Sequence, residues 1–143
     1  EFITAAELKA READIAGKDC LLIRTGFATY RTSNPEVYSS QGPALHPEGA
    51  RYLLDTFPSL KAIGTDCISI ASPAMIDEAI ETHRILCGYH DPKKYVIILE
   101  DFSLDHDLSD LVRLYALPLF IAGVEGSPCT IVAEVGRDQS EGN

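Results

Sequence analysis

The sequence predicts a domain of the α/β class, with α+β as the alternative, from three observations. Short apolar runs of strand length alternate with helical patterns through the first hundred residues. Two further strand-length runs near the C-terminus flank a segment rich in glycine and proline, which indicates that they pair with each other. The length of 143 residues suits one domain with a sizeable core. We therefore expect a single domain over residues 1–143, with a frayed polar tail at 136–143.

The amino-acid composition argues against some classes of binding partner. The chain carries 12 basic and 22 acidic side chains, a net charge of −10, so nucleic acid and anionic membranes would repel it. No run approaches the roughly 20 apolar residues that span a bilayer. The four cysteines are far apart, without the spacing of a zinc or redox motif, which predicts buried reduced thiols. We expect a protein of the reducing cytoplasm.

The first forty-five residues should contain a helix, a strand and a long loop. Thr4 and Glu7 have the spacing of a capping box, so a helix should begin there and end at Gly17. Residues 19–24 form an apolar run that predicts a buried strand. Residues 27–45 lack periodicity and predict a long loop, either functional or a poorly ordered surface segment, in which Tyr30, Arg31 and Tyr38 are only candidate pocket or interface residues.

The middle of the chain predicts a second helix followed by an interrupted strand. His46 precedes Pro47, which suits the first helical position, and Pro58 should end this helix. Residues 62–70 read as a strand interrupted near Gly64. Asp66 within it is either a cap in a turn or a residue that lines a pocket at a strand end.

A third helix and the strand after it contain a histidine and a carboxylate. Helical spacing places His83 on the apolar face formed by Ile76, Ala79, Ile80 and Cys87. The run at 95–99 is rich in β-branched residues and predicts a central strand, which ends at Glu100. Spacing alone does not make either residue a ligand, because such a histidine is commonly a core residue and such a carboxylate is commonly solvated or capping.

The last part should hold an acidic helix or loop and then a pair of strands. Residues 103–114 predict a short helix or loop whose buried side is Leu104, Leu108, Leu111 and Val112. Strands are expected at 117–121 and 129–135. The segment between them, which includes Gly126 and Ser127, suits either a turn that sets the strands side by side, as in an antiparallel pair, or a close approach of the backbone to a ligand. The common nucleotide-binding, serine-hydrolase and zinc-protease motifs do not occur in the sequence.

Several short segments matter more as an ordered set than singly. They occur in the order Leu21–Gly26, Leu45–Leu53, Ile63–Asp66, His83-Arg84, Ile98–Asp101, Leu117–Leu119 and Gly123–Pro128. This order resembles that of the cyclase family, which includes bacterial kynurenine formamidases and isatin hydrolases. The likeness extends from about Ile3 to Val135.

The resemblance implies a metal-dependent hydrolase with a swivelling β/β/α-type fold, a mixed sheet with flanking helices. Such an enzyme would hydrolyse a small-molecule amide, an arylformamide or a cyclic amide, through a metal-bound hydroxide. The family's ligand positions correspond to His83 and Glu100, and imidazole with carboxylate suits Zn²⁺ or Mn²⁺. Asp66, Gly126 and Ser127 are further candidates for shaping the pocket.

One family segment has no counterpart here. The HxGTHxDxPxH segment, which carries the other ligands and the general acid/base, does not occur in the sequence, so no catalytic residue is assigned to this chain. Two ligands would hold a metal weakly, and the chain alone could be inactive. We expect a chain that lacks the N-terminal part of its domain and associates with that part or with copies of itself. The alternative is a shortened, non-catalytic relative that serves as a binding or assembly subunit.

Overall fold

The computed structural model describes residues 1–136, which fall into two compact units. The first unit is Glu1–Ser103 and the second begins at Leu104. Of the predicted tail, only Gly136 is described, and its N–H donates to the carbonyl of Asp110; the rest lies outside the described residues. One domain over residues 1–143, without its N-terminal part, stays a prediction.

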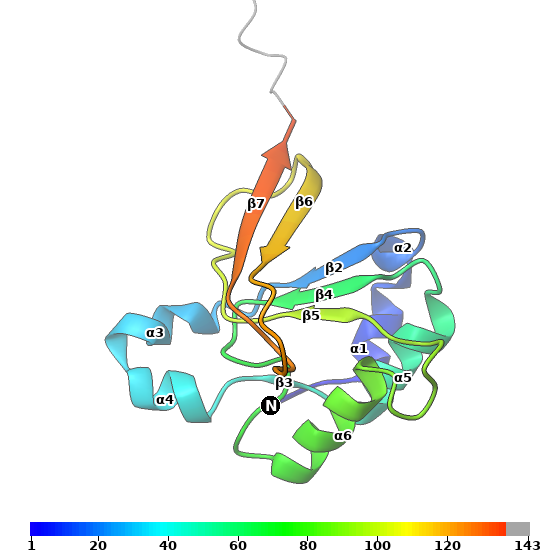
Figure 1. Ribbon diagram of the computed structural model, residues 1–143, viewed down its shortest axis with the longest axis horizontal. Helices are drawn as coiled ribbons and strands as arrows, with labels where there is room; N and C mark the ends of the chain where they lie inside the picture. The colour runs from blue at the N-terminus through cyan, green and yellow to red at the C-terminus, as the bar shows by residue number, and fades with distance from the viewer. Residues whose placement is uncertain (137–143) are drawn as a thin grey trace, which may run out of the picture. The chain divides into compact units, whose positions relative to one another are not determined.

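The first unit is built on a three-stranded parallel sheet with helices beside it, which confirms the α/β class (Figure 1). Its strands are β2 (Cys20–Ile23), β4 (Ala62–Thr65) and β5 (Ile97–Leu99), in the order β2–β4–β5. The prediction that the 95–99 run is central is therefore wrong, and Ile97 is 60% exposed. A β-branched run indicates a strand, but its place in the sheet depends on distant partners. The edge strand β2 is likewise only half-buried.

The predicted N-terminal helix begins where expected but is divided into two short helices. Thr4 and Glu7 form the predicted capping box at α1 (Ala5–Ala10), and a second short helix, α2 (Glu12–Ile15), follows after Arg11. Gly17 has a φ of 74°, the left-handed conformation that ends such helices. A two-residue parallel pair, β1 (Phe2–Ile3) with β3 (Ala44–Leu45), joins this end to the chain before α5.

The predicted second helix is α5 (Pro47–Thr56), and His46 caps it. The ring nitrogen Nδ1 of His46 accepts a hydrogen bond of 3.2 Å from the Glu48 N–H. The core of the first unit lies between the sheet and the helices, and its members are Leu8, Ile15, Leu45, Ala50, Leu53, Phe57, Leu60, Ile63, Ile70, Ala71, Ala79, Ile85, Leu86 and Val96.

The long loop expected at 27–45 is instead a chain of short helices. A 3₁₀ turn at Phe27–Thr29 leads into α3 (Tyr30–Ser33) and α4 (Pro35–Ser40). The Asn34 side chain accepts a hydrogen bond from the Val37 N–H, and Pro35 takes the first helical position. Helices of four to six residues are too short to show periodicity, which is why the sequence reads as a loop. They lie together beyond the end of the sheet where β2 and β4 finish (Figure 1).

The third helix, α6 (Ile76–Leu86), buries a different face from the predicted one. Ala79, Thr82, Ile85 and Leu86 are buried, whereas Ile76 and Ile80 are 60% and 44% exposed. This face includes a polar residue: the fully buried Thr82 hydroxyl donates a 3.0 Å hydrogen bond to the Leu45 carbonyl. A contact of that kind leaves no trace in a hydrophobic pattern. The burial expected of the cysteines likewise holds only for Cys67, since Cys87 at the end of α6 is exposed.

Thr82→Val is expected to lower the free energy of unfolding by about 1–2 kcal/mol, because valine keeps the shape but cannot donate to the Leu45 carbonyl. Urea denaturation measures the change. Thr56→Val at an exposed position of α5 is the matched control and should change stability by less than about 0.5 kcal/mol. Equal stability of the two variants would contradict this role for Thr82.

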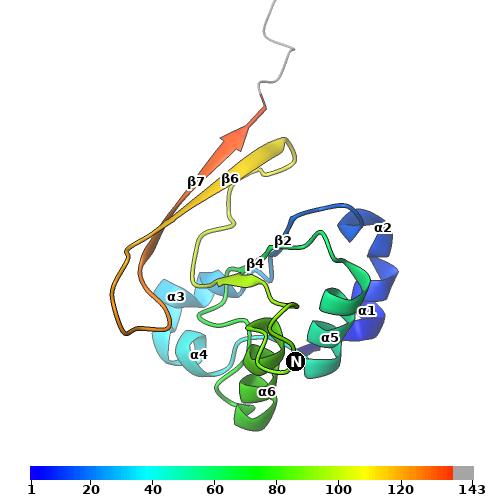
Figure 2. The same ribbon diagram turned by 45° about the vertical axis from the view of Figure 1, so that its right-hand side comes forward.

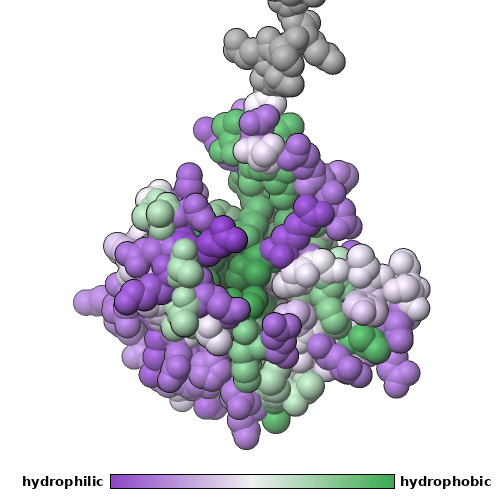
Figure 3. Space-filling model, turned by 180° about the vertical axis from the view of Figure 1, so that it is seen from behind, coloured by the Kyte–Doolittle hydropathy of each residue, from purple (hydrophilic) through white to green (hydrophobic). Residues whose placement is uncertain are grey.

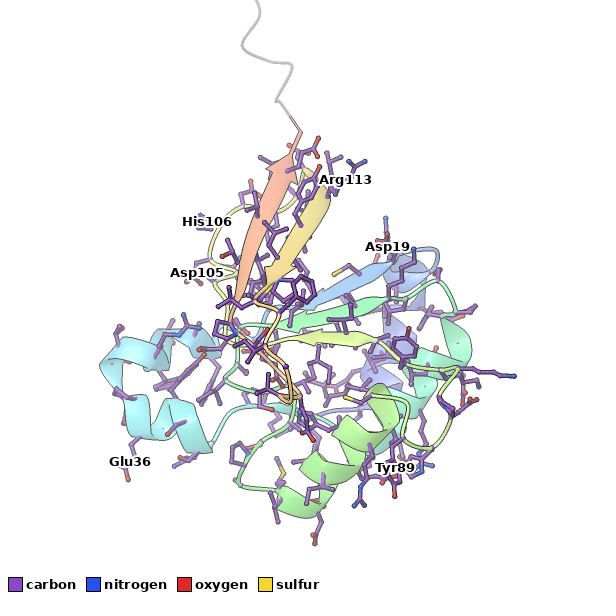
Figure 4. The ribbon with its side chains drawn as sticks, in the orientation of Figure 1. Asp19, Glu36, Tyr89, Asp105, His106 and Arg113 are labelled. Carbon is purple, nitrogen blue, oxygen red and sulfur yellow. The ribbon has the colours of Figure 1, made fainter. Side chains whose placement is uncertain are left out.

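The second unit contains an antiparallel hairpin of β6 (Leu111–Pro118) and β7 (Cys129–Val135), which confirms the predicted pairing (Figure 2). The strand predicted at 117–121 is wrong in its bounds, since it starts six residues earlier and ends at Pro118. The helix or loop predicted for 103–114 is only partly right, because β6 begins at Leu111 and Val112 is 62% exposed. Asp105 and His106 lie in the segment before β6 and are exposed (Figure 4). In the described residues no helix is long and apolar enough to cross a membrane.

Candidate metal centre

His83 occupies the last turn of α6, with its ring held in one orientation. Its Nδ1 lies 2.8 Å from the Ala79 carbonyl oxygen. Because a carbonyl can only accept, Nδ1 carries the hydrogen and Nε2 of the neutral ring has the lone pair. Nε2 is 3.5 Å from Oε1 of Glu100, and both side chains are about one-third exposed. The two predicted ligands therefore face each other at the surface of the first unit.

Glu100 follows directly after β5 and is held by the segment that follows β4. The Ile70 N–H donates to Oε1 at 2.7 Å and the Ser69 hydroxyl donates to the same oxygen at 3.0 Å. The Ile70 carbonyl in turn accepts a 2.9 Å hydrogen bond from the Leu45 N–H. The carboxylate is thus fixed by one backbone group and one hydroxyl.

The pKa values of His83 and Glu100 are shifted in opposite directions. The interaction with Glu100 raises the pKa of His83, against the opposing effect of burial. Burial raises the pKa of Glu100, but the contacts from His83, the Ile70 N–H and Ser69 outweigh it and leave that pKa below its ordinary value. With a neutral ring, two acceptors would face each other, so the pair needs either a proton or a cation.

These residues fit a divalent metal, but only as part of its ligand set. A ligating histidine commonly donates its other ring N–H to a carbonyl, as His83 does to Ala79. Within residues 1–136 there is no group of three or more His, Cys, Asp or Glu side chains that could hold a metal ion. Catalytic zinc sites normally have three protein ligands and a water. A catalytic metal bound here would need ligands besides these two.

Asp66 has the capping role that the sequence left open. It is fully buried, and its carboxylate accepts hydrogen bonds from the Thr25 N–H at 2.8 Å, the Thr25 hydroxyl at 2.6 Å and the Gly26 N–H at 2.8 Å. It thereby ties the loop after β2 to the end of β4. As a residue that shapes a pocket, it would act through that loop.

Gly126 and Ser127 lie in the second unit, in the segment between β6 and β7. They help to line a cavity of about 450 Å³ together with Leu119, Phe120 and Val124. They belong to a different unit from His83 and Glu100, and their role in a substrate pocket stays a prediction.

Ser69 and the Ile70 N–H are site groups that the sequence reading missed. The interruption predicted near Gly64 is found just after it, since β4 ends at Thr65 and the Ile70 N–H then donates to Glu100. The interruption alone does not indicate which residues of the following turn reach Glu100, because that depends on where the turn lies relative to the end of β5.

Comparison with known proteins decides the family. The sequence profile of the family described as "Putative cyclase" matches residues 1–72, half of the chain. The chain belongs to the cyclase family.

Relatives of this cyclase-family chain include hydrolases. It is 34% identical over 117 residues to kynurenine formamidase of Geobacillus thermodenitrificans, which covers 80% of this chain and 49% of that protein. It is 27% identical over 126 residues to cyclase-like protein 2 of Arabidopsis thaliana, covering 88% of this chain and 43% of that protein. The chain thus spans about half the length, or less, of the curated relatives it matches.

Solved structures show the same fold. An isatin hydrolase bound to the product analogue thioisatinate superposes with a TM-score of 0.72 and 21% identity, over 95% of this chain and 53% of that one. A protein described as a potential metal-dependent hydrolase with cyclase activity gives a TM-score of 0.65 and 23% identity, over 92% and 57%. The predicted fold of this family is therefore confirmed.

Proposed function

We propose that the intact protein is a cytoplasmic, metal-dependent amide hydrolase in which His83 and Glu100 are two of the metal ligands. The observation that carries the proposal is the 3.5 Å approach of His83 Nε2 to Glu100 Oε1, with Nδ1 of the same ring committed to Ala79. Membership of the cyclase family and the hydrolase names among its relatives support it.

In the proposed enzyme, the residues of this chain would bind the metal and hold its ligands in orientation. Nitrogen from His83 and oxygen from Glu100 suit Zn²⁺ or Mn²⁺. When bound, such a metal activates water as a nucleophile and stabilises negative charge on a carbonyl oxygen. Ala79 fixes the ring tautomer, and Ser69 with the Ile70 N–H fixes the carboxylate. The general acid/base is expected in the family segment that this sequence lacks.

Substrates of the proposed enzyme are arylformamides or cyclic amides. Support comes from the names of the relatives, a kynurenine formamidase and an isatin hydrolase. A small uncharged amide also suits a chain whose net charge of −10 would repel polyanions.

Metal removal tests the proposal. Dialysis of the intact protein against a chelator should lower hydrolysis of N-formylkynurenine or isatin at least about tenfold, and Zn²⁺ or Mn²⁺ should restore it, because the protein then lacks its activator of water. Rates are followed by absorbance, and bound metal by elemental analysis. Full activity in metal-free protein would contradict the proposal.

A second candidate is a non-catalytic binding or assembly subunit. The hairpin unit favours it, since Phe120, Leu119 and Ile121 are 98%, 60% and 50% exposed, and hydrophobic residues gather along the hairpin in the upper part of Figure 3. A two-stranded sheet alone is marginally stable, so it gains from a partner. A metal-free, stable homo-oligomer, measured by elemental analysis and light scattering, would favour this candidate over the enzyme.

A further inference from the structure

Asp101, the residue after Glu100, has an unusual backbone. Its φ of 59° is the only positive φ of a non-glycine residue in the part of the chain that the structure describes. Aspartate tolerates this left-handed conformation better than most residues, but it still requires support from its surroundings. Whatever holds Asp101 in place also sets the direction in which the chain leaves Glu100.

The side chain of Asp101 is held by two residues of the short helices. The Tyr38 hydroxyl donates to Oδ1 at 2.5 Å, and the Arg31 guanidinium donates to the same oxygen at 2.6 Å. Arg31 also donates to the Tyr38 hydroxyl at 3.0 Å and stacks on its ring, 5.3 Å from the centroid. We call Arg31, Tyr38 and Asp101 the anchor cluster.

Tyr38 is well suited to this role. Its side chain is buried, at 5% exposure, so its hydroxyl geometry is fixed by packing. Burial first, and then the hydrogen bond to Asp101, raise the pKa of Tyr38 to about 12. The phenol is therefore a neutral donor at every pH at which the protein is expected to work.

The anchor cluster also reaches the segment that holds the Glu100 carboxylate. The Asp101 N–H donates to the Cys67 carbonyl at 2.8 Å, and the Tyr38 hydroxyl lies 3.2 Å from the Asp66 carbonyl. Ser69 and the Ile70 N–H, which donate to Glu100, follow directly in the same segment. The cluster thus connects the backbone of Glu100 with the donors to its side chain.

We propose that the anchor cluster is a positioning element for Glu100: Arg31 and Tyr38 hold Asp101 in its left-handed conformation, and so keep the Glu100 carboxylate aligned with Ile70 and His83. The inference rests on the proposed function, because alignment matters there through the metal. Arg31, Tyr38 and Asp101 are positioning residues, since the hydrogen bonds described above join them to one another and to the carbonyls of Cys67 and Asp66 rather than to the proposed ligand atoms.

Metal binding by variants of the intact protein tests the proposal without relying on activity. Tyr38→Phe removes one hydroxyl and leaves the ring, and Asp101→Ala removes the anchored carboxylate. Each should weaken Zn²⁺ binding about tenfold, the low end of the effect of groups that orient ligands. Affinity is measured by competition with a chromophoric chelator. The visible spectrum of bound Co²⁺ should also change, which a loss of stability alone would not cause.

Matched controls separate positioning from general damage. Tyr89→Phe removes a hydroxyl from an exposed tyrosine beyond the end of α6, and Glu36→Gln neutralises an exposed carboxylate on α4 (Figure 4). Both should bind Zn²⁺ as the wild type does. Asp101→Asn should retain more affinity than Asp101→Ala, because asparagine tolerates the left-handed conformation and can accept from Tyr38.

Two results would overturn the proposal in different ways. If Tyr38→Phe and Asp101→Ala keep wild-type Zn²⁺ affinity and Co²⁺ spectrum while Glu100→Ala loses both, the metal site stands and the positioning role is wrong. If Glu100→Ala itself keeps the metal, the proposed function is wrong, and the positioning role with it. Should Asp101→Ala fail to fold, Tyr38→Phe and Asp101→Asn decide the question.

Discussion

Replacing His83 or Glu100 by alanine in the intact protein is expected to weaken Zn²⁺ binding by at least about 100-fold and to lower amide hydrolysis to a similar degree. A group that only orients a ligand is worth about 10–100-fold in affinity, so a ligand itself should be worth more. His83 contributes a lone pair on Nε2, and Glu100 contributes negative charge. Competition titration measures the affinity, and absorbance follows hydrolysis of N-formylkynurenine.

Conservative and distant variants sharpen this experiment. Glu100→Gln can still accept hydrogen bonds from the Ile70 N–H and Ser69, so it should fold normally but bind metal poorly because the charge is gone. His106→Ala removes an exposed imidazole outside the first unit and should leave metal affinity unchanged. Normal metal binding and normal hydrolysis in His83→Ala and Glu100→Ala would remove both residues from the site.

Asp66→Ala is expected to lower the free energy of unfolding by about 2–4 kcal/mol. The substitution removes a fully buried carboxylate and leaves the Thr25 N–H, the Thr25 hydroxyl and the Gly26 N–H without their acceptor. Each buried donor that loses its partner costs about 1–3 kcal/mol, and partial access of water to the loop reduces the sum. Urea denaturation measures the loss.

The control for this variant is an exposed aspartate. Asp77 lies in the first turn of α6, and Asp77→Ala should cost less than about 0.5 kcal/mol. A stability loss at Asp66 no larger than at Asp77 would show that the buried carboxylate does not hold the loop.

Features governed by neighbouring residues could be predicted from the sequence. The capping box at Thr4 and the helix start at His46-Pro47 depend on hydrogen bonds within three or four residues, and both are found. The hairpin of β6 and β7 follows in the same way from two apolar runs with a turn between them. Side chains and turn residues close together in the sequence indicate these elements.

Features governed by distant contacts could not be predicted. The buried face of α6 includes Thr82, whose hydroxyl donates to the carbonyl of Leu45, 37 residues away. The place of β5 at the edge of the sheet depends on which strands pair with β4. A hydrophobic pattern indicates which residues are apolar, but it does not indicate which distant segment of the chain packs against them.

The candidate site could be predicted only in part from the sequence. Helical spacing placed His83 on α6, but only the family resemblance connected it with Glu100, 17 positions later in the sequence. Their approach to 3.5 Å depends on how α6 packs near the end of β5, and the donors Ser69 and Ile70 come from the turn after Thr65. Neither arrangement is visible in local patterns. The remaining ligands stay a prediction, since the described residues contain no group of three or more His, Cys, Asp or Glu side chains that could hold a metal ion.

The donor from residue 70 to Glu100 is a peptide N–H, and the carbonyl of that residue is tied to the Leu45 N–H. Every amino acid except proline carries this N–H. Most substitutions at position 70 would therefore keep the hydrogen bond to the Glu100 carboxylate, because they change only the side chain and leave the N–H in place. A substitution at position 70 would remove this hydrogen bond only if it introduced proline or shifted the backbone of the segment.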